Sequence, residues 1–294
     1  MIRLDAATVL LQWAVGGLFF GWVTTRRREV GVGYGWLIRG TYLALAAGSL
    51  AAAVVLGPVP GRDLATAGVI SATATALVVS VLRRRAGVAG ERARRQRTSA
   101  RVGAMTGDAG GGDAGGPGAS SEPAAGTTPA EFPPVLDLVA PVVGVVGLVV
   151  AGLAAGGDPA LAVVRTLVGA AFLGAVSDAM LLGHWYLVQP GLHRGPLREL
   201  VRWLTALWAV EVGVLLVPPG MVSVLTGAID DGYNGILGWF WLACAVMTIV
   251  LCLVTRAALK ERFYSAVMAA TGLLYLAIVT VFGTDLVARA VLAP

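Results

Sequence analysis

The sequence has few charged residues and few residues that hold metals or redox cofactors. Only 13% of its 294 residues are Asp, Glu, Lys or Arg, whereas ordinary soluble domains carry about 25%. It has two cysteines, Cys244 and Cys252, and two histidines, His184 and His193. No His-x-x-His, Cys-x-x-Cys or Glu-x-x-His spacing of the kind found in metal sites occurs. We therefore predict no metal site and no covalently bound cofactor, and a quinone is the one cofactor that we consider.

Signatures of catalysis and of nucleic-acid binding are also missing. The Gly-x-Ser-x-Gly pattern of serine hydrolases does not occur. The net charge of +5 comes from basic residues that cluster at the ends of apolar runs, where membrane topology explains them. We therefore expect no nucleic-acid partner and no catalytic activity of the chain on its own.

Apolar sequence is abundant, because 57% of the residues are hydrophobic. Several apolar runs reach the roughly 20 residues that a helix needs to cross the hydrocarbon core of a bilayer. We predict an all-α, polytopic integral membrane protein with eight transmembrane helices, in contact with the lipid bilayer. The predicted spans are Leu4–Thr25, Trp36–Leu56, Leu64–Leu82, Val135–Ala155, Leu161–Val188, Leu197–Val217, Ile236–Val254 and Phe263–Phe282.

The spans divide the chain into three regions. Residues 1–82 hold the first three spans, and residues 135–294 hold the other five. The connection at 83–134 is rich in Arg at first and then in Gly, Ala, Pro and Ser. Because the second part of this connection has little apolar surface to bury, we predict that it is disordered.

Basic residues alternate between the connections, which predicts the orientation in the membrane. Cytoplasmic connections carry an excess of Lys and Arg. The basic connections follow the first, third, fifth and seventh spans, at residues 26–28, 83–85, 193–198 and 256–262. We therefore place the Arg-rich connections in the cytoplasm and both termini outside a bacterial-type plasma membrane.

A weak internal repeat indicates that the protein consists of two four-helix halves in the same orientation. Residues 4–57 can be placed on residues 167–220 without gaps, at an offset of 163. The matches that carry weight are the pairs Trp22/Trp185 and Arg39/Arg202. Parallel repeats of this kind, related by an axis along the membrane normal, occur in transporters.

Ionisable residues inside the apolar runs are candidates for function, because a charge in hydrocarbon costs about 2.5–3.5 kcal/mol on insertion scales. The rise of 1.5 Å per residue places Asp178 and Arg202 at the same depth on neighbouring helices, and we predict that they form an ion pair. Arg165 and Glu211 form a second, staggered candidate pair. Both pairs have two interpretations, either structural bridges or groups that handle protons or a ligand.

Aromatic residues at the cytoplasmic end of the fifth span form the candidate ligand pocket. His184, Trp185 and Tyr186 fit an interfacial aromatic belt, and with Asp178 they are also suited to a quinone headgroup. An imidazole or phenol would hydrogen-bond a quinone carbonyl, and a nearby carboxyl group would exchange protons.

Three further acidic positions receive structural interpretations. Asp137 is expected to cap the fourth span through the helix dipole. Asp285 and Arg289 have the i,i+4 spacing of a surface ion pair on a helix. Asp230 and Asp231 lie in an outer connection that we expect to be a solvated acidic turn.

The leading functional hypothesis is a membrane subunit of a larger respiratory-type, electron-transport assembly with other membrane subunits. It would contribute a quinone pocket in the cytoplasmic leaflet. The first alternative is a proton-coupled secondary transporter, in which Asp178 and Glu211 line one central cavity between broken helices. The second alternative is a structural or assembly factor whose buried charges are all ion-paired.

Overall fold

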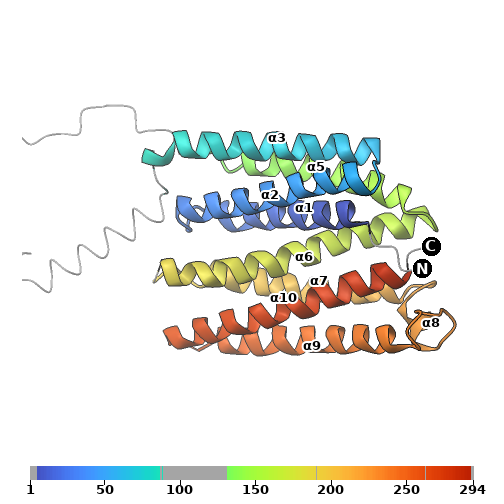
Figure 1. Cartoon of the computed structure of the whole chain (residues 1–294). Coiled ribbons are helices and arrows are strands. Elements are labelled where there is room, and N and C mark those ends of the chain that lie inside the picture. Colours follow the sequence, from blue (N-terminus) through green and yellow to red (C-terminus); the bar gives the residue numbers. More distant parts are fainter. Residues whose placement is uncertain (1–4, 87, 89–130, 190, 262, 293–294) are drawn as a thin grey trace, which may run out of the picture.

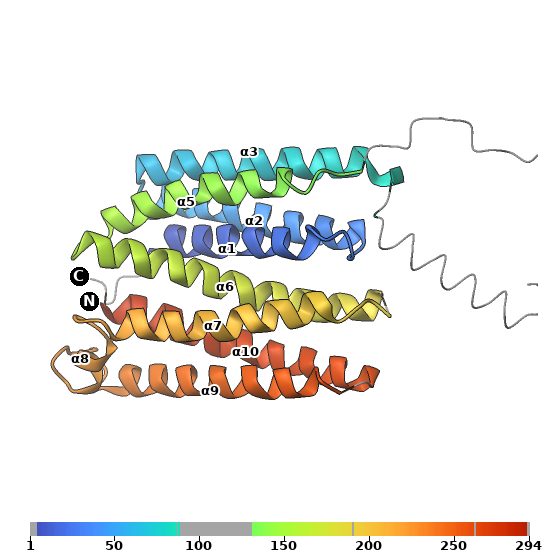
Figure 2. The same cartoon turned by 180° about the vertical axis from the view of Figure 1, so that it is seen from behind.

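The computed structural model describes residues 5–86, 88, 131–189, 191–261 and 263–292, and within these ranges it is helical with no strand. Its long helices lie side by side in one bundle (Figures 1 and 2). The helices and the single 3-10 turn are α1 (Ala6–Thr25), α2 (Val32–Leu56), α3 (Pro60–Leu82), η1 (Arg84–Ala86), α5 (Leu136–Ala154), α6 (Pro159–Val188), α7 (Gly195–Leu216), α8 (Met221–Leu225), α9 (Ile236–Ala258) and α10 (Tyr264–Leu292).

Seven of the described helices are long and apolar enough to cross a membrane, namely α1, α2, α3, α5, α6, α9 and α10. This confirms the all-α, multi-span organisation. The predicted eighth span, α7, has the length to cross and lies lengthwise beside the others (Figure 2). It carries four charged residues, Arg198, Glu199, Arg202 and Glu211, and is not among the seven. The count of eight therefore stays a prediction.

The two ends of the bundle differ in charge. The helix α1 begins and α10 ends at one end of the bundle (Figure 1), which we call the terminal face. The opposite end, which we call the arginine face, holds the ends of α1, α3, α6 and α9 (Figure 1), next to Arg26, Arg83, Arg194 and Arg256. The Arg-rich connections therefore share one face, as the prediction requires, while most of the predicted disordered connection lies outside the described residues.

The helices that pack on one another form two rings of four. In the first ring α1, α2, α3 and α5 each pack on the next, and α5 returns to α1. In the second ring α6, α7, α9 and α10 pack in the same order, and α10 returns to α6. Both α1 and α6 end, and α2 and α7 begin, at positions that differ by 163 residues: Thr25 and Val188, then Val32 and Gly195. This agrees with the predicted two parallel halves.

The two rings meet where α1 crosses α6 at a pair of glycines. A Cβ atom on Gly16 would lie 1.7 Å from the carbonyl oxygen of Ala170, and one on Gly174 would lie 2.1 Å from the carbonyl carbon of Gly16. No side chain fits at either position unless the helices separate. Close approach through small residues is a common way to hold membrane helices together, because lipid supplies no hydrophobic drive for their association.

The last helix is longer than predicted. The helix α10 continues to Leu292, ten residues beyond the predicted end at Phe282. The sequence after Phe282 contains Thr284, Asp285 and Arg289, which resemble the polar border of a span. In the structure Thr284 and Asp285 are buried against the bundle, so this polar turn is packed inside the protein and does not end the helix.

Candidate functional site

Asp178 does not pair with Arg202, and that prediction is wrong. Asp178 is completely buried, and its Oδ1 accepts a hydrogen bond of 2.5 Å from the hydroxyl of Tyr42 on α2. Its Oδ2 has no hydrogen-bond partner among the described residues. Arg202 is exposed on α7. The two residues are at the same depth, but Asp178 faces α1 and α2, and its depth does not determine which way it faces.

The surroundings of Asp178 are polar only in part. Gly21 of α1 forms one wall, where a Cβ atom would lie 3.5 Å from the free Oδ2. The hydroxyl of Tyr34 is also buried and has no partner in the described part of the chain. Asp178 and Tyr42 are therefore a buried acid and phenol at the boundary between the two rings, and no guanidinium of the described residues forms an ion pair with Asp178.

Arg165 and Glu211 do not form a direct ion pair either. The Nη2 of Arg165 donates to the carbonyl oxygens of Val217 and Pro219, each at 2.8 Å, just after α7 ends. The last carbonyls of a helix lack partners within the helix, and the Nε of Arg165 also donates to one of them, that of Val214, at 3.5 Å. Neither carboxyl oxygen of Glu211 accepts a hydrogen bond from a described residue, although the side chain is completely buried.

Asp285 and Arg289 form the predicted i,i+4 pair, but inside the bundle and not on its surface. The Nε of Arg289 donates to both oxygens of Asp285, at 2.9 and 2.8 Å, and Asp285 is completely buried. Gly169 on α6 makes room for the pair, because a Cβ atom there would lie 2.3 Å from Asp285 Oδ1 and from Arg289 Nη2. A larger residue at this position would require the ends of both side chains to shift.

Glu211 faces this pair. Asp285, Arg289 and Arg165 are the charged groups that act on its carboxyl group, although neither of its oxygens has a hydrogen-bond partner among the described residues. We call Arg165, Glu211, Asp285 and Arg289 the acid–arginine cluster. It brings together residues of α6, α7 and α10 near the terminal face.

A cavity of about 530 Å³ opens at the terminal face between the two halves. Arg165 and Arg289 of the acid–arginine cluster line it, together with Gln12 of α1. Neither Asp178 nor Glu211 is part of its lining. The expectation that these two acids line one central cavity is therefore not met by this cavity.

The four candidate residues for a quinone site do not converge on one space. His184 is exposed, and its Nδ1 lies 3.1 Å from the hydroxyl of Tyr275. Trp185 donates to Gln189 at 3.0 Å, while the buried Tyr186 donates to the carbonyl oxygen of His193 at 2.7 Å. Consecutive residues of a helix point about 100° apart, and the side chains follow that pattern. Asp178 lies more than a helical turn away from all three along α6.

Two buried arginines that sequence reasoning did not select hold the first ring together. Arg39 is 4% exposed and donates to both oxygens of Asp137, at 2.7 Å each, which links α2 to α5. Asp137 lies in the first turn of α5 as predicted, but its carboxylate binds this guanidinium and does not cap the helix.

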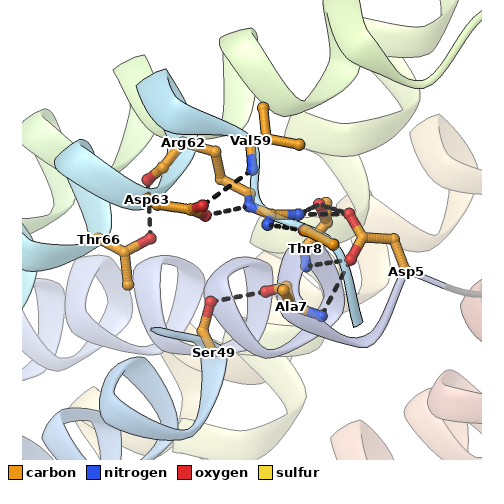
Figure 3. A network of polar contacts seen from close by, with 9 residues as sticks. Asp5, Ala7, Thr8, Ser49, Val59, Arg62, Asp63 and Thr66 are labelled. Carbon is orange, nitrogen blue, oxygen red and sulfur yellow. Dashed lines mark hydrogen bonds and ion pairs between the residues drawn. The ribbon is translucent and has the colours of Figure 1, made fainter. Parts of the chain in front are cut away.

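The second arginine is at the terminal face. Figure 3 shows Arg62 of α3 reaching Asp5 and Thr8 at the start of α1, while its Nε donates to Asp63 at 2.8 Å. The bond to Asp5 is 2.5 Å long. Asp5 also caps α1 through the backbone N–H groups of Ala7 and Thr8. The acid that follows Arg62 in the sequence, Asp63, was the available signal, since buried arginines need an acid.

Asp231 is not the solvated residue that we expected. It lies between α8 and α9, outside the long helices, and is 4% exposed. Its two oxygens accept hydrogen bonds of 2.8–2.9 Å from the backbone N–H groups of Tyr233, Gly235 and Leu237. Desolvation raises the pKa of Asp231, but the backbone N–H groups outweigh it and hold the pKa below its ordinary value. This carboxylate therefore organises the start of α9.

Comparisons with known proteins add no assignment. No family model, no curated protein and no solved structure matches the chain. Among the described residues, no group of three or more His, Cys, Asp or Glu side chains is placed to hold a metal ion. The function must therefore be argued from the buried acids and from the cavity.

Proposed function

We propose that the protein is a proton-coupled secondary transporter whose solute enters through the cavity at the terminal face. The observation that carries the proposal is that Asp178 and Glu211 are completely buried at membrane depth. No Lys, Arg or His nitrogen of the described residues lies within 4.0 Å of either carboxyl group.

A buried carboxylate without a cation is costly, because neither water nor a counter-ion compensates its charge. In its acid form the same group is neutral and has a proton to donate. Asp178 can accept from Tyr42 in either form. Groups that bind and release a proton inside a membrane are the parts from which proton relays of transporters are built.

The two acids lie at different depths. Glu211 is five residues before the end of α7, about 8 Å from the terminal face, and Asp178 is ten residues before the end of α6, about 15 Å from the arginine face. One acid therefore lies beside the cavity and the other lies at the boundary of the two rings. A rocking motion of one ring against the other would change the Tyr42–Asp178 contact.

The other hypotheses have less support. A purely structural role predicts a cation for every buried acid, which fails at Asp178 and Glu211. A quinone site at Asp178, His184, Trp185 and Tyr186 remains an untested prediction that the separation of these side chains does not favour. Membership of a respiratory assembly is likewise untested.

Proteoliposomes that contain a pH-sensitive dye test the proposal. Lactate, alanine and choline serve as an anionic, a zwitterionic and a cationic probe solute. We expect at least one of them to drive proton movement, and we expect Asp178→Asn and Glu211→Gln to abolish it. Asp230→Asn is the matched control, because Asp230 is an exposed acid of the outer connection, and it should leave proton movement unchanged. Proton movement that survives in the double variant Asp178→Asn/Glu211→Gln would contradict the proposal.

Protonation itself has a second readout that needs no solute. Infrared spectra of the purified protein should contain the carbonyl-stretch band of a protonated carboxyl group. We expect part of this band to disappear in Asp178→Asn and another part in Glu211→Gln. Spectra identical to the wild type in both variants would count against protonated acids at these positions.

A further inference from the structure

We infer that the cavity at the terminal face binds a small organic acid that carries a carboxylate, a hydroxyl group and a short alkyl chain, and that a proton on Glu211 favours its binding. The inference rests on the proposed function for its place in transport. The argument for the ligand itself depends on the cavity and its lining.

The cations of the cavity have unused donors. Arg165 donates through Nε and Nη2 to carbonyl oxygens of residues 214–219, and Arg289 donates through Nε and Nη2 to Asp285 and to the carbonyl oxygen of Arg165. The Nη1 of each guanidinium donates to no described residue. Both residues line the cavity. Two such donors are suited to a carboxylate, since charge-assisted hydrogen bonds are stronger than neutral ones.

Gln12 supplies a second, independent indication of a ligand. It is completely buried, and its Nε2 donates to the carbonyl oxygen of Thr166 at 2.7 Å, which determines the orientation of the amide. Gln12 is one of the residues that line the cavity, and its Oε1 has no partner among the described residues. An amide oxygen only accepts hydrogen bonds. The ligand should therefore present a donor to Gln12, and a hydroxyl group next to the carboxylate is the simplest one.

The same turn of α6 positions all three polar groups. Gln12 of α1 and Arg289 of α10 donate to successive carbonyl oxygens of α6, those of Thr166 and Arg165. Arg165 itself binds the end of α7. The floor of the cavity is thus a rigid junction of four helices, about 9 Å into α6 from its first residue, Pro159.

The remaining wall is mostly apolar. It includes Val9, Ala151, Leu161, Ala162, Leu215 and Ile229. A volume of about 530 Å³ lies within the range of small-molecule sites, which are mainly apolar with a few placed polar groups. Such a wall accommodates a short alkyl chain beside the carboxylate.

The charges of the acid–arginine cluster couple this ligand to a proton. Arg165 and Arg289 contribute two positive charges, and Asp285, paired with Arg289, contributes one negative charge. When Glu211 is protonated, one positive charge remains for an anion. When Glu211 releases its proton, the cluster is neutral. A ligand carboxylate and the proton on Glu211 should therefore bind together and leave together.

Two further acids line the cavity, namely Asp158, which caps the start of α6, and Asp5, which is paired with Arg62. Neither of them alters the difference of one charge that a proton on Glu211 makes. Glu211 lies on α7, which packs on α6, α9, α8 and α1, and α1 has no charged residue within Ala6–Thr25. Arg165 faces it from α6, and Asp285 and Arg289 face it from α10. The helix α8 has no ionisable residue, and the single charged residue of α9, Arg256, is at the arginine face.

Direct binding measurements on the full chain in phosphatidylcholine nanodiscs test the inference. The probes are 2-hydroxyhexanoate, hexanoate and hexylamine, measured by isothermal titration calorimetry. We expect 2-hydroxyhexanoate to bind, hexanoate to bind about tenfold more weakly because the oxygen of Gln12 stays unpaired, and hexylamine not to bind. Gln12→Leu should remove the preference for the hydroxyl group and keep hexanoate binding. Equal binding of all three probes, or of none, would overturn the inference.

A separate variant, Glu211→Gln, tests the coupling between ligand binding and the proton on Glu211. Affinity for 2-hydroxyhexanoate should fall as the pH rises in the wild type, and it should be independent of pH in Glu211→Gln, where the side chain is permanently neutral. Arg289→Gln should abolish binding. If this variant does not fold, the loss of the hydroxyl preference in Gln12→Leu still tests the inference. The same pH dependence in Glu211→Gln as in the wild type would refute the coupling.

The outcomes separate this inference from the proposed function. Proton movement driven by alanine or choline, without binding of the hydroxy acid, would leave the transporter proposal intact and defeat the inference. Binding of the hydroxy acid without any proton movement in proteoliposomes would support the ligand class and defeat the transporter proposal.

Discussion

The two rings of the bundle differ in how completely their buried acids are paired, although the second ring also contains the paired Asp285 and Arg289. In the first ring, Arg39 binds Asp137 through two hydrogen bonds, and Arg62 binds Asp5 and Asp63. In the second ring and at its boundary, Glu211 and Asp178 are buried with no cation at ion-pair distance. Paired charges are a sign of structural clamps, whereas uncompensated acids can change their protonation state. The paired charges thus hold the fold together, and the unpaired acids Asp178 and Glu211 are the groups that can exchange protons.

The largest effect is expected from breaking a clamp of the first ring. Arg39→Ala leaves the Asp137 carboxylate nearly buried without its cation, which should lower the free energy of unfolding by about 3–5 kcal/mol. Thermal unfolding in detergent measures this loss. The double variant Arg39→Ala/Asp137→Ala should be more stable than the single one, because no charge is then left unpaired. A double variant as unstable as Arg39→Ala would show that the clamp is not the cause.

The next effect concerns the glycine that accommodates the pair in the second ring. Gly169→Ala places a Cβ atom against both Asp285 and Arg289, and overpacking of this kind costs about 1–3 kcal/mol. The helical position alone would favour Ala over Gly by up to about 1 kcal/mol. Gly213→Ala is the control, because a Cβ atom there meets nothing within 4 Å. Equal thermal stability of the two variants would refute the tight fit at Gly169.

A small effect is expected when an uncompensated acid is neutralised. Asp178→Asn keeps an oxygen that accepts from Tyr42 and removes any cost of a buried charge, so the free energy of unfolding should change by less than about 1 kcal/mol. The same variant should lose proton movement in proteoliposomes. A loss of stability as large as that of Arg39→Ala would place Asp178 among the structural charges and remove the contrast between the rings.

The smallest effect is a dependence on pH outside the membrane. The pKa of Asp231 is lower in the folded protein than its unfolded value of about 3.9. Its carboxylate therefore stabilises the start of α9 fully above pH 3.9, and this contribution is lost as the pH falls through the lower, folded pKa. Thermal unfolding should show a weaker acid sensitivity in Asp231→Asn than in the wild type. Identical acid sensitivity would argue against the role of this carboxylate.

The sequence predicted best those features that depend only on the position of residues along the chain. The apolar runs predicted the multi-span helical fold, and the boundary between α1 and α2 matches that between α6 and α7 at the predicted offset of 163. Asp178 and Glu211 were also selected correctly as buried acids, because a carboxyl group inside an apolar run is conspicuous. The choice of partners failed for both, and the quinone and respiratory hypotheses remain untested.

The predicted ion-pair partners of Asp178 and Glu211 were wrong for a geometric reason. Depth along a helix follows from residue number, but each residue turns the side chain by about 100°, and the face that is buried depends on which helix packs there. Asp178 and Arg202 share a depth and face different ways. The polar turn at Thr284 and Asp285 resembles the end of a span, but in the structure α10 packs on α6 and α9, and Gly169 of α6 lies against Asp285. The Gly16–Gly174 contact has no signal in the sequence beyond two glycines among 40.

The sequence by itself determined that the chain forms long apolar helices with an arginine-rich end, because hydrophobic length and charge position depend on composition alone. Only the tertiary structure decided that Arg39 and Arg62 are neutralised and that Glu211 and Asp178 are not. Whether a buried charge is neutralised depends on the distance between atoms on different helices. That distance is determined by the packing of α1 on α6, and of α10 on both α6 and α9, which no single stretch of sequence contains.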